Sequence, residues 1–166
     1  MSQFYLAALQ LSLCLGPMAM GIYITMKVFN IPDITTDGSY TLGAAVAATL
    51  LMHHWPPLFV LPICMLAGAI AGICTALAHT KLKIDALLAG ILVMTGMYSI
   101  NLIILGRSNI PLINIPGVFQ SFIIFKNELY NQLFIAVIIV FVLSLLLHYL
   151  LRTDFGIAMR ATGNNP

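Results

Sequence analysis

Charged side chains are scarce in this chain of 166 residues, and their scarcity excludes most classes of soluble protein. Only 7% of the residues are charged and 61% are hydrophobic, whereas a soluble domain carries about 25% charged residues. The mean hydropathy of +1.03 agrees with that composition. We therefore expect an integral membrane protein. The net charge of +2 is also too small to indicate nucleic-acid binding.

Cysteines and catalytic motifs are equally sparse. The three cysteines, Cys14, Cys64 and Cys74, lie inside apolar runs, where neither a disulfide framework nor a zinc site is expected. The sequence contains no HExxH, CxxC, hydrolase elbow or Walker-type phosphate loop. Its five acidic residues and four histidines are scattered. We therefore expect no catalytic residue, no metal and no cofactor, and an intramembrane enzyme is the weakest hypothesis.

Long apolar runs are what the sequence has in abundance. A bilayer core about 30 Å thick is crossed by roughly 20 residues of helix. The runs predict transmembrane helices at residues 4–26, 58–78, 86–105 and 133–151, with a shorter one at 38–52. The first run lacks the basic region and cleavage site of a signal peptide, so we interpret it as a retained span. The expected fold is an all-α, polytopic helical membrane protein with about five transmembrane helices.

The second of these helices is short for a full crossing. It spans the bilayer only if part of the polar stretch before it also lies at membrane depth, as in a discontinuous helix. With five crossings, one side of the membrane receives five basic residues and the other receives two: Lys27, Lys81, Lys83, Arg152 and Arg160 against Arg107 and Lys126. By the positive-inside rule, the C-terminal tail is then cytoplasmic.

Two segments between the runs are expected outside the hydrocarbon. His53, His54, Trp55 and the two prolines that follow predict a turn at the membrane interface, although adjacent histidines are also metal-ligand types. Residues 106–132 are mixed in polarity and predict an extramembrane excursion, with a short interfacial helix near residues 118–125.

The stretch FNIPDITTDGSYTLG, residues 29–43, interrupts the apolar pattern and holds Asp33 and Asp37. Hydrocarbon tolerates such polar backbone only where protein or a water-filled cavity surrounds it. The stretch is therefore either a loop in water, with Asp37 or Ser39 capping the next helix, or the lining of a path for a polar solute. In the second case the helix start suits a carboxylate, and Thr35, Thr36 or Asp37 suits an ammonium group.

Two further polar patterns lie on predicted helices. Thr95 and Ser99 are four residues apart on one helix face, where they either line a cavity or bond to a neighbouring helix. In the tail, Phe155, Ala158 and Met159 fall at helical spacing beside Arg160. This pattern predicts a short amphipathic helix, which lies either against a cytosolic partner or on the membrane surface.

Several separate stretches resemble one known family. The longest is IPDITTDGSYTLGAAV, residues 31–46. Shorter ones are HTKLKI (79–84), LAGILVMT (88–95), YSINL (98–102), GRSNIPL (106–112), TDFG (153–156) and RATGNNP (160–166). Together they resemble the permeases of ABC importers of the branched-chain amino acid and ribose class, and within it the subgroup associated with tryptophan or tyrosine uptake. The last two stretches resemble the start of the cytoplasmic loop that couples such permeases to their ATPase.

The resemblance implies a permease subunit of an ATP-driven amino acid importer, aromatic amino acids included, in the bacterial plasma (inner) membrane. Implied partners are an ATP-binding subunit, a periplasmic or lipid-anchored substrate-binding protein, a second permease copy in a dimer, and membrane lipid; nucleic acid is not among them. Together with the polar patterns above, it gives as substrate-path candidates Thr35, Thr36, Asp37, Gly38, Ser39, Thr95 and Ser99. The ATPase-coupling candidates are Phe155, Arg160, Gly163, Asn164 and Pro166.

The chain also departs from the family pattern. Such permeases continue with further spans, whereas this chain stops at Pro166, inside the coupling loop, and it carries Asn164 where the family usually has Asp. We therefore expect residues 1–166 to be the N-terminal part of a permease transmembrane domain. The competing hypothesis is a non-transporting helical membrane scaffold, or a decayed permease fragment, in which polar groups serve helix packing.

Overall fold

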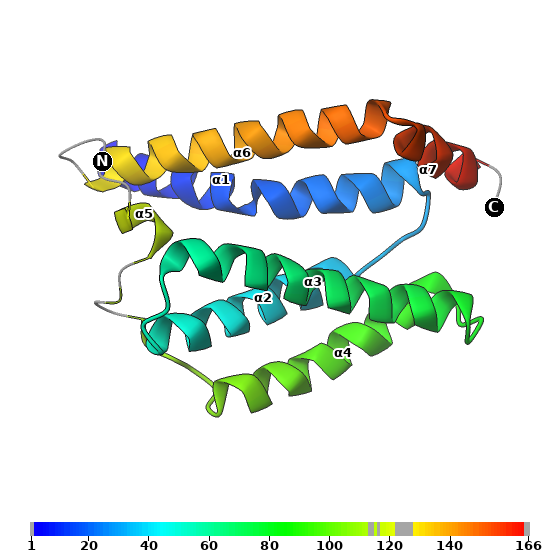
Figure 1. The fold of residues 1–166 in the computed structure, drawn as a ribbon, viewed down its shortest axis with the longest axis horizontal. Helices are drawn as coiled ribbons and strands as arrows, with labels where there is room; N and C mark the ends of the chain where they lie inside the picture. Colours follow the sequence, from blue (N-terminus) through cyan, green and yellow to red (C-terminus); the bar gives the residue numbers. More distant parts are fainter. Residues whose placement is uncertain (1, 113–114, 116, 122–127, 165–166) are drawn as a thin grey trace. The chain divides into compact units, whose positions relative to one another are not determined.

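A computed structural model describes residues 2–112, 115, 117–121 and 128–164 of the chain. This part of the chain is helical and contains no strand, which confirms the all-α prediction. The helices gather into two compact units (Figure 1). Unit 1 comprises Met1–Ile31 and Phe122–Pro166, and unit 2 comprises Pro32–Ser121.

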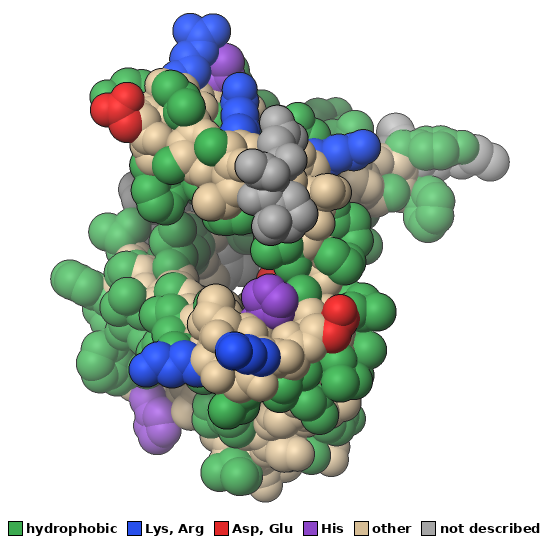
Figure 2. Space-filling model, turned by 90° about the vertical axis from the view of Figure 1, so that its right-hand side faces the viewer, with side chains coloured by type: hydrophobic (Ala, Val, Ile, Leu, Met, Phe, Trp, Pro, Cys, Tyr) green, Lys and Arg blue, Asp and Glu red, His purple; other side chains and the backbone are tan. Residues whose placement is uncertain are grey.

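The surface of the chain is largely apolar. Figure 2 shows many hydrophobic side chains on the face that it draws, beside Lys, Arg and His side chains, and large hydrophobic residues are strongly exposed, including Ile103 at 80% and Phe4 at 75%. Among the described residues, four stretches of helix are long and apolar enough to cross a membrane: Gln3–Val28, Pro57–Thr80, Ala86–Leu105 and Glu128–Arg152. Exposed apolar side chains on such helices face lipid. The chain is therefore a multi-pass membrane protein.

Unit 1 pairs two long helices that run in the same direction (Figure 1). α1 (Ser2–Tyr23) continues as a π-helix, η1 (Ile24–Val28), and lies beside α6 (Glu128–Arg152). Three contacts fix the direction, because residue numbers rise together in them: Gln10 with Gln132, Gly16 with Val140, and Val28 with Leu151. α1 and α6 are therefore parallel.

A short helix closes unit 1 at the end of α6. This helix, α7 (Asp154–Asn164), packs on η1 as well as on α6. Its buried residues lie on one face: Gly156, Met159 and Gly163. Met159 joins Val28 and Leu151 in a buried apolar cluster. A Cβ atom at Gly163 would collide with the backbone oxygen of Val28, so α7 approaches η1 closely because this position has no side chain.

Unit 2 places α2 (Thr35–Met52) against two other helices, α3 (Pro57–Thr80) and α4 (Ala86–Leu105), with the short α5 (Val118–Ser121) beside α3. Residue numbers rise on α2 as they fall on α3 in two contacts, Thr35 with Thr75 and Gly43 with Cys64. In two contacts between α2 and α4, Gly38 with Met94 and Thr49 with Ile104, the residue numbers of both helices rise together. Hence α2 is antiparallel to α3 and parallel to α4. Leu42, Ala71 and Met97 form the buried core between them.

The helix directions are consistent with the fifth crossing that the sequence predicts. α2 is absent from the four apolar stretches, because its first turns carry hydroxyl and acidic side chains. Within unit 1, however, α1 and α6 are parallel, so the chain between them crosses the membrane an odd number of times. α3 and α4 supply two of these crossings. α2, which runs alongside both, is the candidate for the third, and its crossing stays a prediction.

The helix boundaries refine the sequence prediction. α4 begins and ends where it was expected, and α6 begins earlier, at Glu128 rather than residue 133, because its polar first turns are also helical. The residues between α2 and α3 form the predicted turn, with His54 in the left-handed region at φ 58°. The short helix expected near 118–125 is observed as α5, and the remainder of that range lies outside the described residues.

The start of α2 is the main correction. The polar residues expected to precede the helix form its first turns instead, since α2 begins at Thr35 and not at residue 38. Asp33 accepts a hydrogen bond from the Thr35 backbone nitrogen at 2.8 Å. The predicted capping residues, Asp37 and Ser39, are therefore wrong: both lie inside the helix, and the Ser39 hydroxyl donates to the Thr36 carbonyl at 2.9 Å. Low helix propensity made this segment look like a loop.

Candidate functional site

The first turn of α2 lies inside the ends of the helices that flank it (Figure 1). A Cβ atom at Gly90 would lie 3.2 Å from the Ile34 nitrogen, and one at Gly38 would lie 3.0 Å from the Met94 Cα atom. At 1.5 Å per residue, Gly90 is about 6 Å and Met94 about 12 Å from the start of α4. α4 is itself about 30 Å long, the thickness of a bilayer core. Asp37, next to Gly38, therefore lies level with the middle part of α4 rather than with its end.

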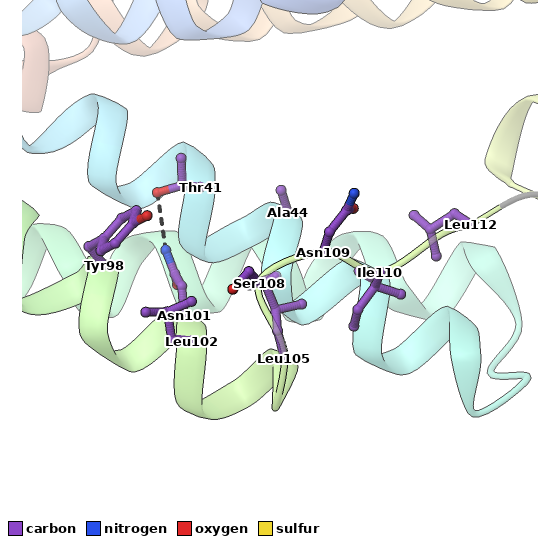
Figure 3. A pocket seen from close by; sticks show the side chains of 12 residues that line it. Thr41, Ala44, Tyr98, Asn101, Leu102, Leu105, Ser108, Asn109, Ile110 and Leu112 are labelled. Atoms are coloured by element: carbon purple, nitrogen blue, oxygen red, sulfur yellow. Dashed lines mark hydrogen bonds between the residues drawn. The ribbon is translucent and has the colours of Figure 1, made fainter.

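Two adjoining cavities follow the seam between α2 and α4. The first has a volume of about 330 Å³ and is lined by Asp37, Gly38, Thr41, Met94, Thr95 and Tyr98. The second, of about 360 Å³, is lined from α2, α4 and the segment after α4, with Asn101, Ser108 and Asn109 as polar members (Figure 3). Thr41 and Tyr98 line both. We call the two cavities together the α2–α4 groove.

The groove collects three of the seven predicted substrate-path residues. Asp37, Gly38 and Thr95, from two helices, line one cavity. The Asp37 side chain is exposed, and the described residues offer its carboxylate no ion pair. The Thr95 hydroxyl donates to carbonyls of its own helix, at 3.0 Å to Ile91 and 2.9 Å to Leu92. Its oxygen retains the capacity to accept a hydrogen bond from a solute.

The other four predicted path residues lie elsewhere. Thr35 is 2% exposed, and its hydroxyl oxygen lies 2.8 Å from that of Thr75 on α3. This buried pair joins two helices, which is the packing role that the sequence left open for such residues. Thr36, Ser39 and Ser99 line neither cavity, and Ser99 is exposed. Sharing a helix face with Thr95 was thus insufficient to place Ser99 in the groove.

Three residues of the groove, Thr41, Tyr98 and Asn101, were not predicted from the sequence to act together. Asn101 is 6% exposed and donates from Nδ2 to the Thr41 hydroxyl oxygen at 3.2 Å (Figure 3). Tyr98 lies one helical turn away and is 67% exposed. An aromatic and an amide three residues apart on an apolar helix are a usable signal, but the sequence does not show that α2 faces them.

The predicted ATPase-coupling residues differ in their exposure on α7. Phe155 is 65% exposed and Arg160 is also exposed, whereas Gly163 is buried against η1. The helix itself was predicted, but its inward face was not: Met159 is buried without Phe155 or Ala158. Asn164 is the last residue of α7. Pro166 lies outside the residues that the structure describes.

Metal-binding geometry is not found in the described part of the chain. No three His, Cys, Asp or Glu side chains there come together as a metal site. The adjacent histidines, His53 and His54, sit exposed in the turn between α2 and α3. The groove is therefore best interpreted through hydrogen bonding and charge.

Comparison with known proteins gives a consistent result. Residues 4–166 match the family described as "Branched-chain amino acid transport system / permease component". A "Tyrosine transport system permease protein" of Clostridioides difficile is 40% identical over 154 residues, which cover 93% of this chain and 50% of that protein. A "Probable branched-chain amino acid transport permease protein" of Methanocaldococcus jannaschii is 35% identical over 163 residues, covering 90% of this chain and 50% of that protein.

A third relative is an uncharacterized protein of Rickettsia prowazekii, 32% identical over 163 residues, which cover 96% of this chain and 55% of that protein. The chain thus spans about half the length of the curated relatives it matches. No solved structure matches it significantly.

Proposed function

Because this chain belongs to the family of branched-chain amino acid transport system permease components, we propose that it forms part of the transmembrane path of an ATP-driven amino acid importer. The relative named as a tyrosine transport permease supports an aromatic amino acid as the substrate. Transport permeases are not themselves enzymes, so ATP hydrolysis belongs to a separate ATP-binding subunit.

The α2–α4 groove is the observation that carries this proposal. A charged Asp at bilayer depth costs about 2.5–3.5 kcal/mol on insertion scales, and ionisable residues within membrane spans commonly mark the pathways of solutes. In this proposal Asp37 lies at that depth, and it lines a cavity of about 330 Å³, large enough for an amino acid. Its carboxylate is the natural partner of the substrate's ammonium group.

In this proposal the orientation of the chain in the membrane follows from the charge distribution. Lys27 on η1 and the basic residues Lys81 and Lys83 after α3 lie on the side that the positive-inside rule assigns to the cytoplasm. The segment after α4, with Ser108 and Asn109 in the groove wall, then lies on the outer side. A periplasmic or lipid-anchored binding protein delivers substrate there, to a pore completed by a second permease copy in the plasma membrane.

The cytoplasmic partner contacts α7 in this proposal. Phe155 and Arg160 are exposed on that helix, where an apolar ring and a cation together suit a protein surface. Gly163 acts from the inside by letting α7 pack closely on η1. The coupling surface is therefore Phe155 with Arg160, and the segment from Gly163 onward supports its position.

Uptake by the complete transport system tests the role of Asp37. Asp37→Asn removes the charge and keeps the size, so the loss of a charge-assisted hydrogen bond should lower uptake about tenfold or more. Asp85→Asn is the matched control, because Asp85 caps α4 by accepting from the Leu87 nitrogen at 3.0 Å and Asn caps equally well. Equal uptake by both variants at equal expression would favour the scaffold hypothesis.

Co-purification tests the coupling surface separately. The chain should be isolated with an ATP-binding subunit from the membranes in which both are made. Arg160→Glu should reduce the amount recovered, whereas Arg107→Glu, on the opposite side, should not. Undiminished recovery with Arg160→Glu would exclude α7 as the docking helix.

A further inference from the structure

Asn101 carries a buried polar atom that no other group satisfies. The side chain is 6% exposed, and its Oδ1 atom has no hydrogen-bond partner among the described residues. Buried polar side chains nearly always find a partner, and an exception in a native structure calls for an explanation. In hydrocarbon there is no water to supply the missing bond. Since Asn101 lines the α2–α4 groove, a solute in the groove could supply the missing donor.

The neighbouring hydroxyl fixes which end of the amide is unpaired. The Thr41 hydroxyl donates its single hydrogen to the Gly38 carbonyl at 3.0 Å. It can therefore only accept from Asn101, and the amide must present Nδ2 to it, at 3.2 Å (Figure 3). The unpaired atom is thus the amide oxygen. A partner for it must bring an N–H or O–H group.

The surroundings of Asn101 are otherwise apolar. Ala44, Ala45 and Ala48 form a low wall on the α2 side, and Leu102 and Leu105 lie on the α4 side of the same cavity. Tyr98 borders the cavity and exposes 67% of its surface. Tyr98 also lines the cavity that holds Asp37, so an aromatic ring between Asp37 and Asn101 would lie beside it. A single polar acceptor in such a wall fixes orientation and provides specificity.

The spacing along α2 matches one amino acid. Asp37 and Thr41 are four residues apart, a rise of about 6 Å, and Thr41 holds Asn101 by the hydrogen bond just described. A solute whose ammonium group lies at Asp37 thus extends its side chain past Tyr98 towards Asn101. A side chain of that length with an N–H or O–H group at its far end reaches the amide oxygen, and the exposed Tyr98 beside the path favours an aromatic one.

This inference rests on the proposed function. We propose that Asn101 is a specificity-determining residue, whose amide oxygen accepts a hydrogen bond from the far end of an aromatic substrate. The donor is the phenolic hydroxyl of tyrosine or the indole N–H of tryptophan. The oxygen is enclosed in this structure, so the ligand reaches it when the exposed Tyr98 side chain turns aside, and the Asn101 amide keeps its bond to Thr41. A site built to bond a hydroxyl rejects the analogue that lacks it, because its own polar group is left unpaired.

Binding of L-tyrosine and L-phenylalanine to the purified full chain in lipid nanodiscs tests this inference. The two ligands differ only in the hydroxyl group, and O-methyltyrosine adds a ligand that keeps the oxygen but lacks its hydrogen. The chain should bind tyrosine at least tenfold more tightly than either analogue. This comparison requires no substitution, so it does not depend on the folding of a variant.

Substitution then assigns the preference to Asn101. Asn101→Leu should weaken tyrosine binding to the level of phenylalanine and leave phenylalanine binding unchanged or tighter, which also shows that the variant is folded. Thr49→Val is the matched control on the same helix pair, since Thr49 donates to Ala45 and Ile104 and lines neither cavity. It should keep the full preference.

The outcomes separate the two proposals. Equal binding of tyrosine, O-methyltyrosine and phenylalanine to the unmodified chain would overturn the role of Asn101 and leave the proposed function standing. A tenfold preference that survives in Asn101→Leu would likewise overturn it. If no amino acid binds the unmodified chain, the specificity inference is overturned, whereas the proposed function fails only if the complete transport system takes up no amino acid.

Discussion

Replacing Gly38 with alanine should force α2 and α4 apart at the groove. A Cβ atom at this position would lie 3.0 Å from the Met94 Cα atom and 3.4 Å from its Cβ atom. Carbon atoms pack best at about 3.5–4.0 Å, so the helices must separate by roughly half an ångström or more. The obstacle is backbone, which cannot rotate away as a side chain does.

The size of the effect follows from a comparison with a second glycine on the same helix pair. Gly96 has nothing within 4 Å of an added Cβ atom, so Gly96→Ala gains only helix propensity, about 0.5–1 kcal/mol. Gly38→Ala gains the same propensity and adds the cost of overpacking, about 1–3 kcal/mol. The propensity term cancels in the difference between the two variants. Gly38→Ala should therefore be about 1–3 kcal/mol less stable than Gly96→Ala.

Thermal unfolding of the purified chain in one detergent, followed by circular dichroism, measures this difference. Gly38→Ala should melt several degrees below Gly96→Ala, with the unmodified chain between them or close to Gly38→Ala. A transport assay on the same variants should show the larger loss for Gly38→Ala, because the groove wall moves. Equal melting of the two alanine variants would refute the close packing of α2 on α4.

Three other predictions concern single contacts. Thr35→Val should lower the free energy of unfolding by about 1 kcal/mol, because it removes the buried hydrogen bond to Thr75. A double-mutant cycle with Thr75→Val should show a coupling energy of about 0.5–1.5 kcal/mol. Additive losses in the cycle would contradict the bond. Gly163→Ala should release α7 from Val28, seen as faster amide hydrogen exchange across α7, and unchanged exchange would disprove the packing. Asp85→Ala should lower stability by about 1 kcal/mol through loss of a helix cap, while Asp85→Asn should not; equal stability of the two variants would exclude a capping role.

Much of the helical framework could be predicted from composition and run length. Apolar runs bounded by Lys, Pro or Gly gave α4 its observed limits and α3 nearly so. The parity of crossings, which the charge count supported, agrees with the parallel arrangement of α1 and α6. These properties depend on hydropathy and on chain connectivity, both of which are local in the sequence.

The start of α2 could not be predicted in the same way. Thr35, Thr36, Asp37, Gly38 and Ser39 have low intrinsic helix propensity, and only tertiary packing overrides it. Thr35 is buried against α3, and Gly38 lies against the α4 backbone. Both contacts join residues that are far apart in the chain, so a local sequence pattern does not predict them.

The residues that line the groove could not be predicted from the sequence for the same reason. Asp37 and Thr95 line it, whereas Ser99, on the same predicted face as Thr95, does not. Asn101 looked like an ordinary polar residue on a span until its oxygen was found buried without a partner. Which helix faces which is decided by close approach at glycines such as Gly38 and Gly90, and a single sequence does not pair them.

Cysteine labelling at position 37 is the most direct measurement of the central claim that the α2–α4 groove carries an amino acid across the membrane. Asp37→Cys and Ser99→Cys should be made in a chain whose Cys14, Cys64 and Cys74 are replaced by alanine, and both should be treated in membranes with a water-soluble thiol reagent. The account predicts that Asp37→Cys reacts and that added tyrosine slows the reaction, while Ser99→Cys, outside both cavities, is insensitive to tyrosine. Labelling of Asp37→Cys that is as fast as in an open loop and indifferent to tyrosine would contradict it.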